Sequence, residues 1–147
     1  MKEKFMHEAI KEAKKSYKKN EVPVGCVIEK NGKIISKAHN LKETKKNPLA
    51  HAEIIAINKA TKKFKNWRLY NCNMYVTMEP CCMCAGAIKQ ARLKKVYYGV
   101  PNDNSLCRKI LNKEDNNKKV EIEGNVLSIE CKELIQTFFK KQRKHDF

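Results

Sequence analysis

Residues 71–100, NCNMYVTMEPCCMCAGAIKQARLKKVYYGV, decide the fold of this chain. The segment NCNMYVTM (71–78) is mostly apolar and predicts a largely buried strand. Glu79-Pro80 is expected to open a helix through CCMCAGAIKQA (81–91), because proline is favoured in the first turn of a helix. KKVYYGV (94–100) then predicts another strand. Alternating strands and helices of this kind are typical of an α/β domain.

Upstream of this stretch, the sequence predicts a helix, a hairpin and a second helix. Apolar residues recur at helical spacing near the start of the chain, at Phe5, Ala9, Ala13 and Tyr17. Residues 22–38, VPVGCVIEKNGKIISKA, predict two strands joined at Asn31-Gly32, a dipeptide that tolerates the positive φ angles of a tight hairpin. Asn47-Pro48 is expected to cap and begin the second helix, which would run to residue 64.

Downstream, the sequence predicts three further elements. They are a short helix around residues 106–111, a strand at 120–122 and a long C-terminal helix over about 128–144. No repeat and no linker divides the 147 residues, so we expect a single domain over residues 1–147. A hairpin followed by alternating helices and strands predicts an α/β fold with helices on both faces of a mixed sheet.

The composition excludes several classes of protein. With 41% apolar and 33% charged residues, and 5 Gly and 4 Pro, the chain is not collagenous, of low complexity or fully disordered. No apolar run approaches the length of a membrane helix, and the first residues lack the apolar core of a secretory signal. The 7 Cys are therefore expected to be free thiols or metal ligands in a cytoplasmic protein without a membrane partner.

The charge points to an anionic partner. The chain has 32 Lys and Arg against 16 Asp and Glu, a formal net charge of +16, which favours binding to polyanions such as nucleic acids. A second interpretation stays open, because 28 of the 32 basic residues are Lys. A bias toward Lys and Asn also arises from an AT-rich genome and then only places charge on solvated faces.

Two short motifs could carry chemistry, and both lie at expected helix starts. They are His51-Ala52-Glu53 and the run Pro80-Cys81-Cys82-Met83-Cys84. His51, Cys81 and Cys84 supply one imidazole and two thiolates, a set that suits Zn²⁺ and leaves its fourth tetrahedral position open for water. Glu53 lies two residues from His51, where its carboxylate can accept a proton from that water.

Two other interpretations of these motifs remain. A structural zinc site would need a fourth protein ligand, for which the candidates are Cys26, Cys72, Cys82, Cys107, Cys131 and His39. A redox Cys-x-x-Cys pair would use the two thiols but would leave His51 and Glu53 without a role.

The motifs also resemble a known family. His-x-Glu followed by Pro-Cys-x-x-Cys is the signature of the zinc-dependent nucleoside and nucleobase deaminases. The similarity runs almost end to end and is closest to the tRNA-specific adenosine deaminases, which convert the wobble adenosine to inosine. It is carried by VPVGCVI (22–28), AHNLKET (38–44), NPLAHAEIIAI (47–57), NWRLYNCNMYVTMEPCCMCAGAI (66–88), ARLKKVYYGV (91–100) and TFFKKQRK (137–144).

The resemblance implies a fold and an activity. The fold would be the cytidine-deaminase-like three-layer α/β/α sandwich with a five-stranded mixed sheet. The activity would be hydrolytic deamination of adenosine to inosine at the wobble position of a tRNA anticodon stem-loop, with one Zn²⁺ per chain. Bacterial members are homodimers, and a heterodimer with a related chain stays open. A deaminase of a free nucleobase or nucleotide, such as guanine or cytosine, is the alternative with the same zinc site.

The resemblance also implies roles for individual residues. His51, Cys81 and Cys84 match the zinc ligands, and Glu53 matches the proton shuttle. The C-terminal helix matches the element that packs beside the anticodon loop. The implied substrate contacts are Asn40, Pro23, Val24, Gly25, Ala52, Asn102, Asp103, Phe138, Phe139, Lys140 and Arg143.

Some of these residues have structural alternatives. Asn40 could simply cap a turn, and at least one of Phe138 and Phe139 is expected in the core. Cys26, Cys72, Cys107 and Cys131 are expected to be small core residues. The chain departs from its relatives at residues 100–106, VPNDNSL, which are shorter than the corresponding loop and contain no glycine. Fewer loop contacts to the RNA are therefore expected.

Overall fold

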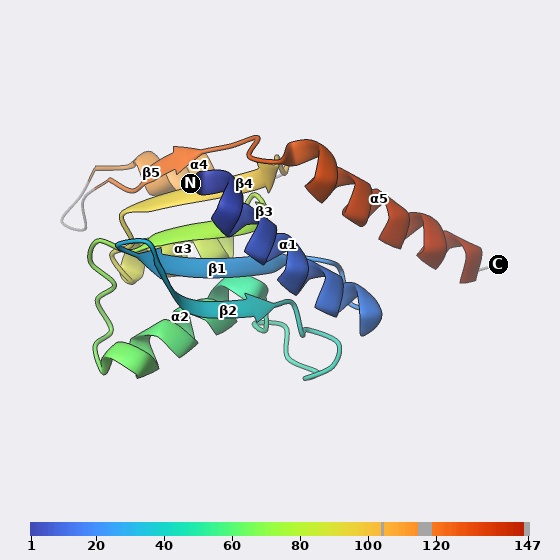
Figure 1. Ribbon diagram of the computed structural model, residues 1–147, viewed down its shortest axis with the longest axis horizontal. Helices are drawn as coiled ribbons and strands as arrows, with labels where there is room; N and C mark the ends of the chain where they lie inside the picture. Colours follow the sequence, from blue (N-terminus) through green and yellow to red (C-terminus); the bar gives the residue numbers. More distant parts are fainter. Residues whose placement is uncertain (104, 115–118, 146–147) are drawn as a thin grey trace.

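A five-stranded sheet in the order β2-β1-β3-β4-β5 forms the middle layer of the computed structural model (Figure 1), which describes residues 1–103, 105–114 and 119–145. The strands are β1 (Gly25–Lys30), β2 (Lys33–His39), β3 (Asn73–Met78), β4 (Lys95–Val100) and β5 (Glu121–Glu123). β1 runs antiparallel to β2 and β3, whereas β3, β4 and β5 run parallel to one another. The sheet is therefore mixed, as the sequence predicts.

Helices cover both faces of this sheet. They are α1 (Lys2–Lys18), α2 (Ala52–Phe64), α3 (Cys82–Gln90), α4 (Cys107–Asn112) and α5 (Ser128–His145). α1 and α5 pack on one face, and α2 packs on the other face with α3 and α4 beside it (Figure 1). This arrangement confirms the predicted three-layer α/β/α sandwich. No helix of the described chain is both long and apolar enough to cross a membrane.

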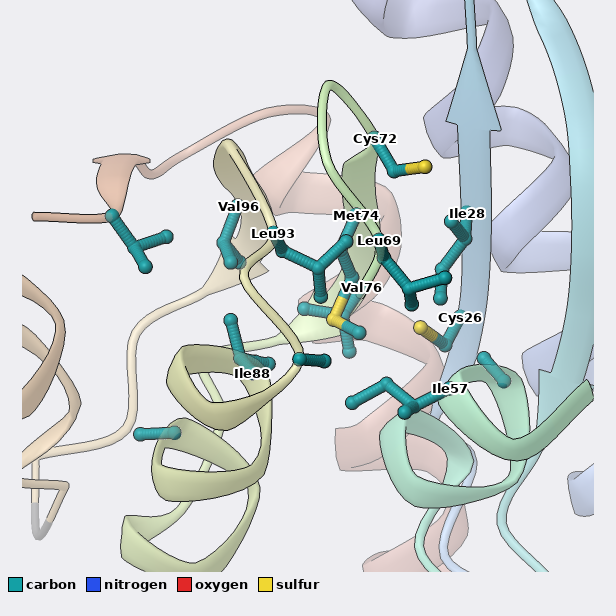
Figure 2. Packing of buried hydrophobic residues seen from close by; sticks show 14 of the residues in the cluster. Cys26, Ile28, Ile57, Leu69, Cys72, Met74, Val76, Ile88, Leu93 and Val96 are labelled. Atoms are coloured by element: carbon teal, nitrogen blue, oxygen red, sulfur yellow. The ribbon is translucent and has the colours of Figure 1, made fainter. Parts of the chain in front are cut away.

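Two apolar clusters hold the layers together. Figure 2 shows the cluster on the α2 and α3 face, where Ile57 and Ile88 point toward the strands. On the other face, residues of α1 and α5 pack against Val27 and Tyr75 of the sheet. Cys26, Cys72, Cys107 and Cys131 are all buried free thiols, which confirms that they are core residues.

The predicted start of the second helix was wrong. The helix begins at Ala52 with His51 as its N-cap, and not at Asn47-Pro48. The Asn47 side chain instead accepts a hydrogen bond from the backbone N–H of Leu49 (2.9 Å), and the Asn47 carbonyl accepts the N–H of Ala50 (3.1 Å). Asn favours such local turns as readily as helix caps, so the chain turns here before the helix starts.

Candidate active site

The starts of α2 and α3 bring the two sequence motifs together. His51 is the N-cap of α2 and Cys81 is the N-cap of α3, while Cys84 lies in the first turn of α3. N-cap side chains commonly accept a hydrogen bond from the helix they begin. Neither His51 nor Cys81 does so. The imidazole and the thiol are therefore available to bind a ligand.

The three candidate ligand atoms lie at the spacing of a zinc site. His51 Nδ1 is 3.7 Å from Cys81 Sγ and 3.5 Å from Cys84 Sγ, and all three atoms lie within 4.8 Å of one another. In a tetrahedral site, Zn–N bonds of about 2.0–2.1 Å and Zn–S bonds of about 2.3 Å place nitrogen and sulfur about 3.6 Å apart. The two nitrogen–sulfur distances thus fit a zinc ion.

The described residues supply three ligands and no fourth. Among the parts of the chain that the structure describes, the group of His, Cys, Asp and Glu able to hold a metal consists of His51, Cys81 and Cys84. Cys82 is exposed, and His39 pairs with Glu12 and Lys19 instead. A closed structural site is therefore disfavoured, because a catalytic zinc keeps one position for water.

Mutual hydrogen bonding perturbs the two thiols. Hydrogen bonds from Cys84 and His51 lower the pKa of the Cys81 thiol to about 3, so Cys81 is a thiolate. The same bond to Cys81, together with burial, raises the pKa of the Cys84 thiol far above its ordinary value. A metal ion competes with protons for such groups, so zinc binding would displace the proton that Cys84 retains.

Glu53 lies beside the three ligands and is almost fully buried, with 4% of its surface exposed. Burial raises the pKa of the Glu53 carboxyl to about 7. The effect of burial outweighs backbone hydrogen bonding and the charge of His51, which both lower the pKa. A carboxyl with a pKa near neutrality can both accept and donate a proton, as a general acid–base catalyst must.

These groups border a cavity of about 200 Å³. Of the predicted substrate-contact residues, Val24, Asn40, Ala52 and Asn102 line it beside the two ligands His51 and Cys81 and beside Glu53. The Asn40 side chain donates to the carbonyl of Val22 (3.3 Å) and accepts the N–H of Lys42 (3.3 Å). Asn40 therefore does cap a turn, and the same bonds hold it at the cavity wall.

Four residues of the lining were missed by the sequence analysis. They are Val22, Lys42, Met78 and Glu79. Each lies within two positions of a residue that was singled out, so extending the motifs along the chain would have found them. Glu79 is buried and accepts the backbone N–H of Asn102 (3.1 Å), which fixes the loop after β4 against the cavity.

Seven predicted substrate contacts lie outside the cavity lining, and three of them, Pro23, Gly25 and Asp103, do not belong to α5. Pro23 is buried, and Asp103 is exposed. Gly25 packs against α1, where a Cβ atom would come within 1.9 Å of the carbonyl oxygen of Ala9. A close approach of β1 to α1 thus accounts for the glycine. Asn104, in the loop predicted to be shorter than in relatives, lies outside the described residues.

A groove continues from the cavity to α5. It shares Val22, Asn40 and Lys42 with the cavity and extends to Phe138 and Gln142. Phe138 is buried, with its ring 6.1 Å from the ring of Tyr17, whereas Phe139 is 44% exposed. One phenylalanine of the pair is thus in the core, as predicted. Phe139, Lys140 and Arg143 line a separate hollow on α5.

Comparison with known proteins places the chain among deaminases. Residues 1–100 match the model of the cytidine and deoxycytidylate deaminase zinc-binding region. A tRNA-specific adenosine deaminase of Streptococcus pyogenes serotype M18 is 45% identical over 95% of this chain and 91% of its own length. The tRNA-specific adenosine deaminase of Bacillus subtilis (strain 168) is 44% identical over 97% of this chain and 91% of its own.

Solved structures agree with this placement. A tRNA:A34 deaminase, studied for A-to-I editing at the wobble position of transfer RNA, has a TM-score of 0.84 and 30% identity over 89% of this chain and 98% of its own. A guanine deaminase from Bacillus subtilis is 40% identical over 67% of this chain and 64% of its own, with a TM-score of 0.64. The site geometry and the length of these matches agree that this chain belongs to the zinc-binding cytidine and deoxycytidylate deaminase family and, within it, to the tRNA-specific adenosine deaminases.

Proposed function

We propose that this chain deaminates adenosine to inosine at the wobble position of tRNA anticodons, with one Zn²⁺ held by His51, Cys81 and Cys84. The observation that carries the proposal is the meeting of these three ligands with the buried Glu53 at the wall of one cavity. Identity of about 45% to tRNA-specific adenosine deaminases over most of the chain supports the choice of substrate.

The reaction consumes water and releases ammonia. Zinc, when bound, supplies a Lewis acid that lowers the pKa of a water from about 16 toward 7. Glu53 takes a proton from the attacking water and delivers it to the ring nitrogen next to the amino-bearing carbon. The water oxygen bonds to that carbon. Glu53, deprotonated again, takes the second proton from the hydroxyl now bonded to the carbon and passes it to the amino group. The carbon–nitrogen bond breaks, ammonia leaves with the bonding electron pair, and the oxygen forms the carbonyl of inosine.

The cavity suits a single base. Its volume of about 200 Å³ is below the range of about 300–1,000 Å³ typical of pockets for drug-sized ligands. Asn40, Ala52 and Asn102 are positioned to contact a base that has left its stack. A base must be unstacked to enter such a site, which favours a single-stranded loop as substrate.

The charge and α5 supply the remaining affinity in this proposal. A net charge of +16 favours the phosphates of an anticodon stem-loop, and Phe139, Lys140 and Arg143 offer an exposed aromatic ring with two cations. We propose α5 as the RNA-facing element of a single deaminase domain over residues 1–147. A homodimer in the cytoplasm completes the proposal, and measurement of the mass in solution, alone and with a related chain, tests the homodimer against a heterodimer.

The test is to sequence inosine in total tRNA after incubation with the zinc-loaded protein. We expect inosine at position 34 of at least one tRNA and no such product with Glu53→Gln, which keeps the shape of the side chain. Glu53→Ala should lower the rate at least about a thousandfold, because both proton transfers are lost. Wild-type turnover in either variant would remove Glu53 from the mechanism.

A free base is the competing substrate, since the 40% identical guanine deaminase matches two thirds of the chain. Assays with free guanine, cytosine and adenine run beside the tRNA assay. Rapid release of ammonia from a free base, without inosine in tRNA, would overturn the proposed substrate and leave the zinc chemistry standing.

A salt titration tests the role of α5. Each phosphate contact contributes a slope of about −0.7 to −0.9 in log K against log salt. Removing residues 140–147 should weaken stem-loop binding and flatten this slope, with zinc content unchanged. Lys140→Gln and Arg143→Gln should each reduce the steepness of this slope by up to the contribution of one phosphate contact. Equal slopes and affinities in all these proteins would show that the basic end of α5 is only a solvated helix terminus.

A further inference from the structure

Glu21 is a buried carboxylate that the proposed mechanism does not use. Only 1% of its surface is exposed. It lies three residues after the end of α1. Its backbone N–H donates to the carbonyl of Ser16 (2.9 Å), and Asn20 adopts a left-handed φ of 63°. The N–H of Asn20 also bonds to the carbonyl of Tyr17, which completes a Schellman motif. The backbone of Glu21 is thus fixed by the end of the helix.

The carboxylate of Glu21 holds the loop between β2 and α2. One oxygen accepts the backbone N–H of Glu43 (3.0 Å), and the other accepts the backbone N–H of Thr44 (2.6 Å). Figure 1 shows this loop beside the C-terminal end of α1. Burial alone would raise the pKa of Glu21, but the hydrogen bonds from Thr44 and Glu43 keep that pKa below its ordinary value. The group is therefore charged at neutral pH, as two donated N–H groups require.

The loop has little else to hold it in place. Residues 42–49 are all exposed, so no side chain anchors them in the core. Hydrogen bonds inside the loop form its turns, for example from the N–H of Asn47 to the carbonyl of Lys42 (3.0 Å). Among the described residues outside the loop, Glu21 is the one that hydrogen-bonds residues 43–48.

This loop forms part of the site. Lys42 lines both the cavity and the groove that leads to Phe138, and Glu43 and Thr44 line the groove. We propose that Glu21 is a positioning residue, which holds residues 41–47 as a fixed wall of the cavity and groove and so sets the affinity for the RNA. The substrate in this inference rests on the proposed tRNA function, whereas the contact itself does not.

Glu21→Gln is an informative variant because two physical effects predict opposite results. Removing a negative charge beside an RNA site should strengthen RNA binding if only the field matters. Gln has a single carbonyl oxygen, so its NH₂ group would face one of the two backbone N–H groups and free that side of the loop. Our inference predicts weaker binding despite the more favourable charge.

Glu29 offers a matched control at the other end of β1. It is 5% exposed and accepts the backbone N–H of Gly32 (3.0 Å) and the side-chain amide of Asn73 (2.7 Å). Glu29→Gln therefore makes the same charge change at a buried carboxylate that also holds a turn, but at the hairpin end of the strand. Its effect on stability should be similar, and its effect on KM should be absent.

The experiment measures kcat and KM for an anticodon stem-loop, and amide hydrogen exchange of the free protein. For Glu21→Gln we expect KM to rise about tenfold, equivalent to about 1.4 kcal/mol, with kcat within about twofold and zinc content unchanged. Exchange at Glu43 and Thr44 should become faster in Glu21→Gln and stay at the wild-type rate in Glu29→Gln. Glu21→Asp, which keeps the charge but is one methylene shorter, should change both quantities in the same direction and serves if the Gln variant does not fold.

The outcomes separate this inference from the proposed function. An active wild type whose KM and exchange are unchanged in the Glu21 variants would overturn the inference. Equal changes in the Glu29 variant would also overturn it, because they would show a general loss of stability. A wild-type protein without activity on tRNA would refute the proposed function, while faster exchange at Glu43 and Thr44 would still support the positioning contact.

Discussion

Replacing Gly25 by alanine tests whether this glycine serves packing or substrate binding. A Cβ at this position would lie 1.9 Å from the carbonyl oxygen of Ala9 and 2.5 Å from the backbone nitrogen of Ala13. Both obstacles are main-chain atoms of α1, so no rotamer change relieves them, and β1 must move about 1 Å from the helix to bring the 1.9 Å contact to 3.0 Å. The N–H of Gly25 would also be pulled from Thr77 Oγ1, which it now reaches at 3.1 Å. Overpacking costs about 1–3 kcal/mol, and we expect about 3 kcal/mol here because a backbone cannot yield locally.

The assay is urea and thermal unfolding of Gly25→Ala beside Gly86→Ala. A Cβ at Gly86, within α3, meets nothing within 4 Å. Both variants restrict the unfolded chain equally, so their difference isolates the clash. We expect Gly86→Ala to be neutral or up to about 1 kcal/mol more stable, and Gly25→Ala to lose roughly 10 °C in Tm. Wild-type stability of Gly25→Ala with lost activity on RNA would refute the packing argument and make Gly25 a substrate contact.

Three further predictions concern the metal ligands and acid stability. Cys82 is exposed and lies outside the ligand group. In metal analysis, Cys82→Ser should retain one zinc per chain and Cys81→Ser should lose it. The reverse result would refute the ligand assignment. Chelation should lower Tm, since zinc at a thousand times its Kd adds about 4 kcal/mol to the folded state, and an unchanged Tm would contradict a site formed by folding. Burial would raise the pKa of Glu12, but hydrogen bonds from Lys15 and His39 lower it below the ordinary value of 4.5 in the folded protein. The Glu12 carboxylate therefore stabilises the fold fully above pH 4.5, and this stabilisation is lost as the pH falls through the pKa of the folded state. Unfolding free energies between pH 7 and 3 should therefore fall less steeply in Glu12→Gln, and equal slopes would refute this.

Local sequence patterns predicted most of the fold because each element carries its own signal. The hairpin at Asn31-Gly32 forms as expected, with Gly32 at a φ of 81°. The third helix occupies Cys82–Gln90, within one residue of its predicted bounds. The start of α2 was missed because Asn47 has two local options, a helix cap or a turn. Contacts elsewhere in the chain, such as the bond from the N–H of Leu41 to the carbonyl of Ala50, decide between them.

The candidate site likewise contains residues that local sequence patterns could predict and residues that they could not. The ligand trio and Glu53 could be predicted because their spacing within two motifs is local. Glu21 gave no such signal, because the N–H groups it accepts lie 22 and 23 residues further along the chain. The sequence predicts that Gly25 contacts substrate, and the structure adds that a Cβ there would meet Ala9 and Ala13 of α1. Only the tertiary structure shows whether a glycine leaves room for a neighbouring helix or for a ligand.

The two parts of the site are also held by different physical means. The chemical groups sit at the starts of α2 and α3, whose apolar faces are packed into the main core through Ile57 and Ile88. The walls that would meet RNA are loops held by buried carboxylates, Glu21 for residues 43–44 and Glu79 for Asn102. Loops tolerate changes of length and sequence far better than core helices do. The shorter 100–106 loop expected from the resemblance to the family would fit this division, because it would alter a wall and leave the starts of α2 and α3 packed in the core. We therefore expect that substrate recognition can vary in this fold without disturbing the groups proposed to carry out the deamination.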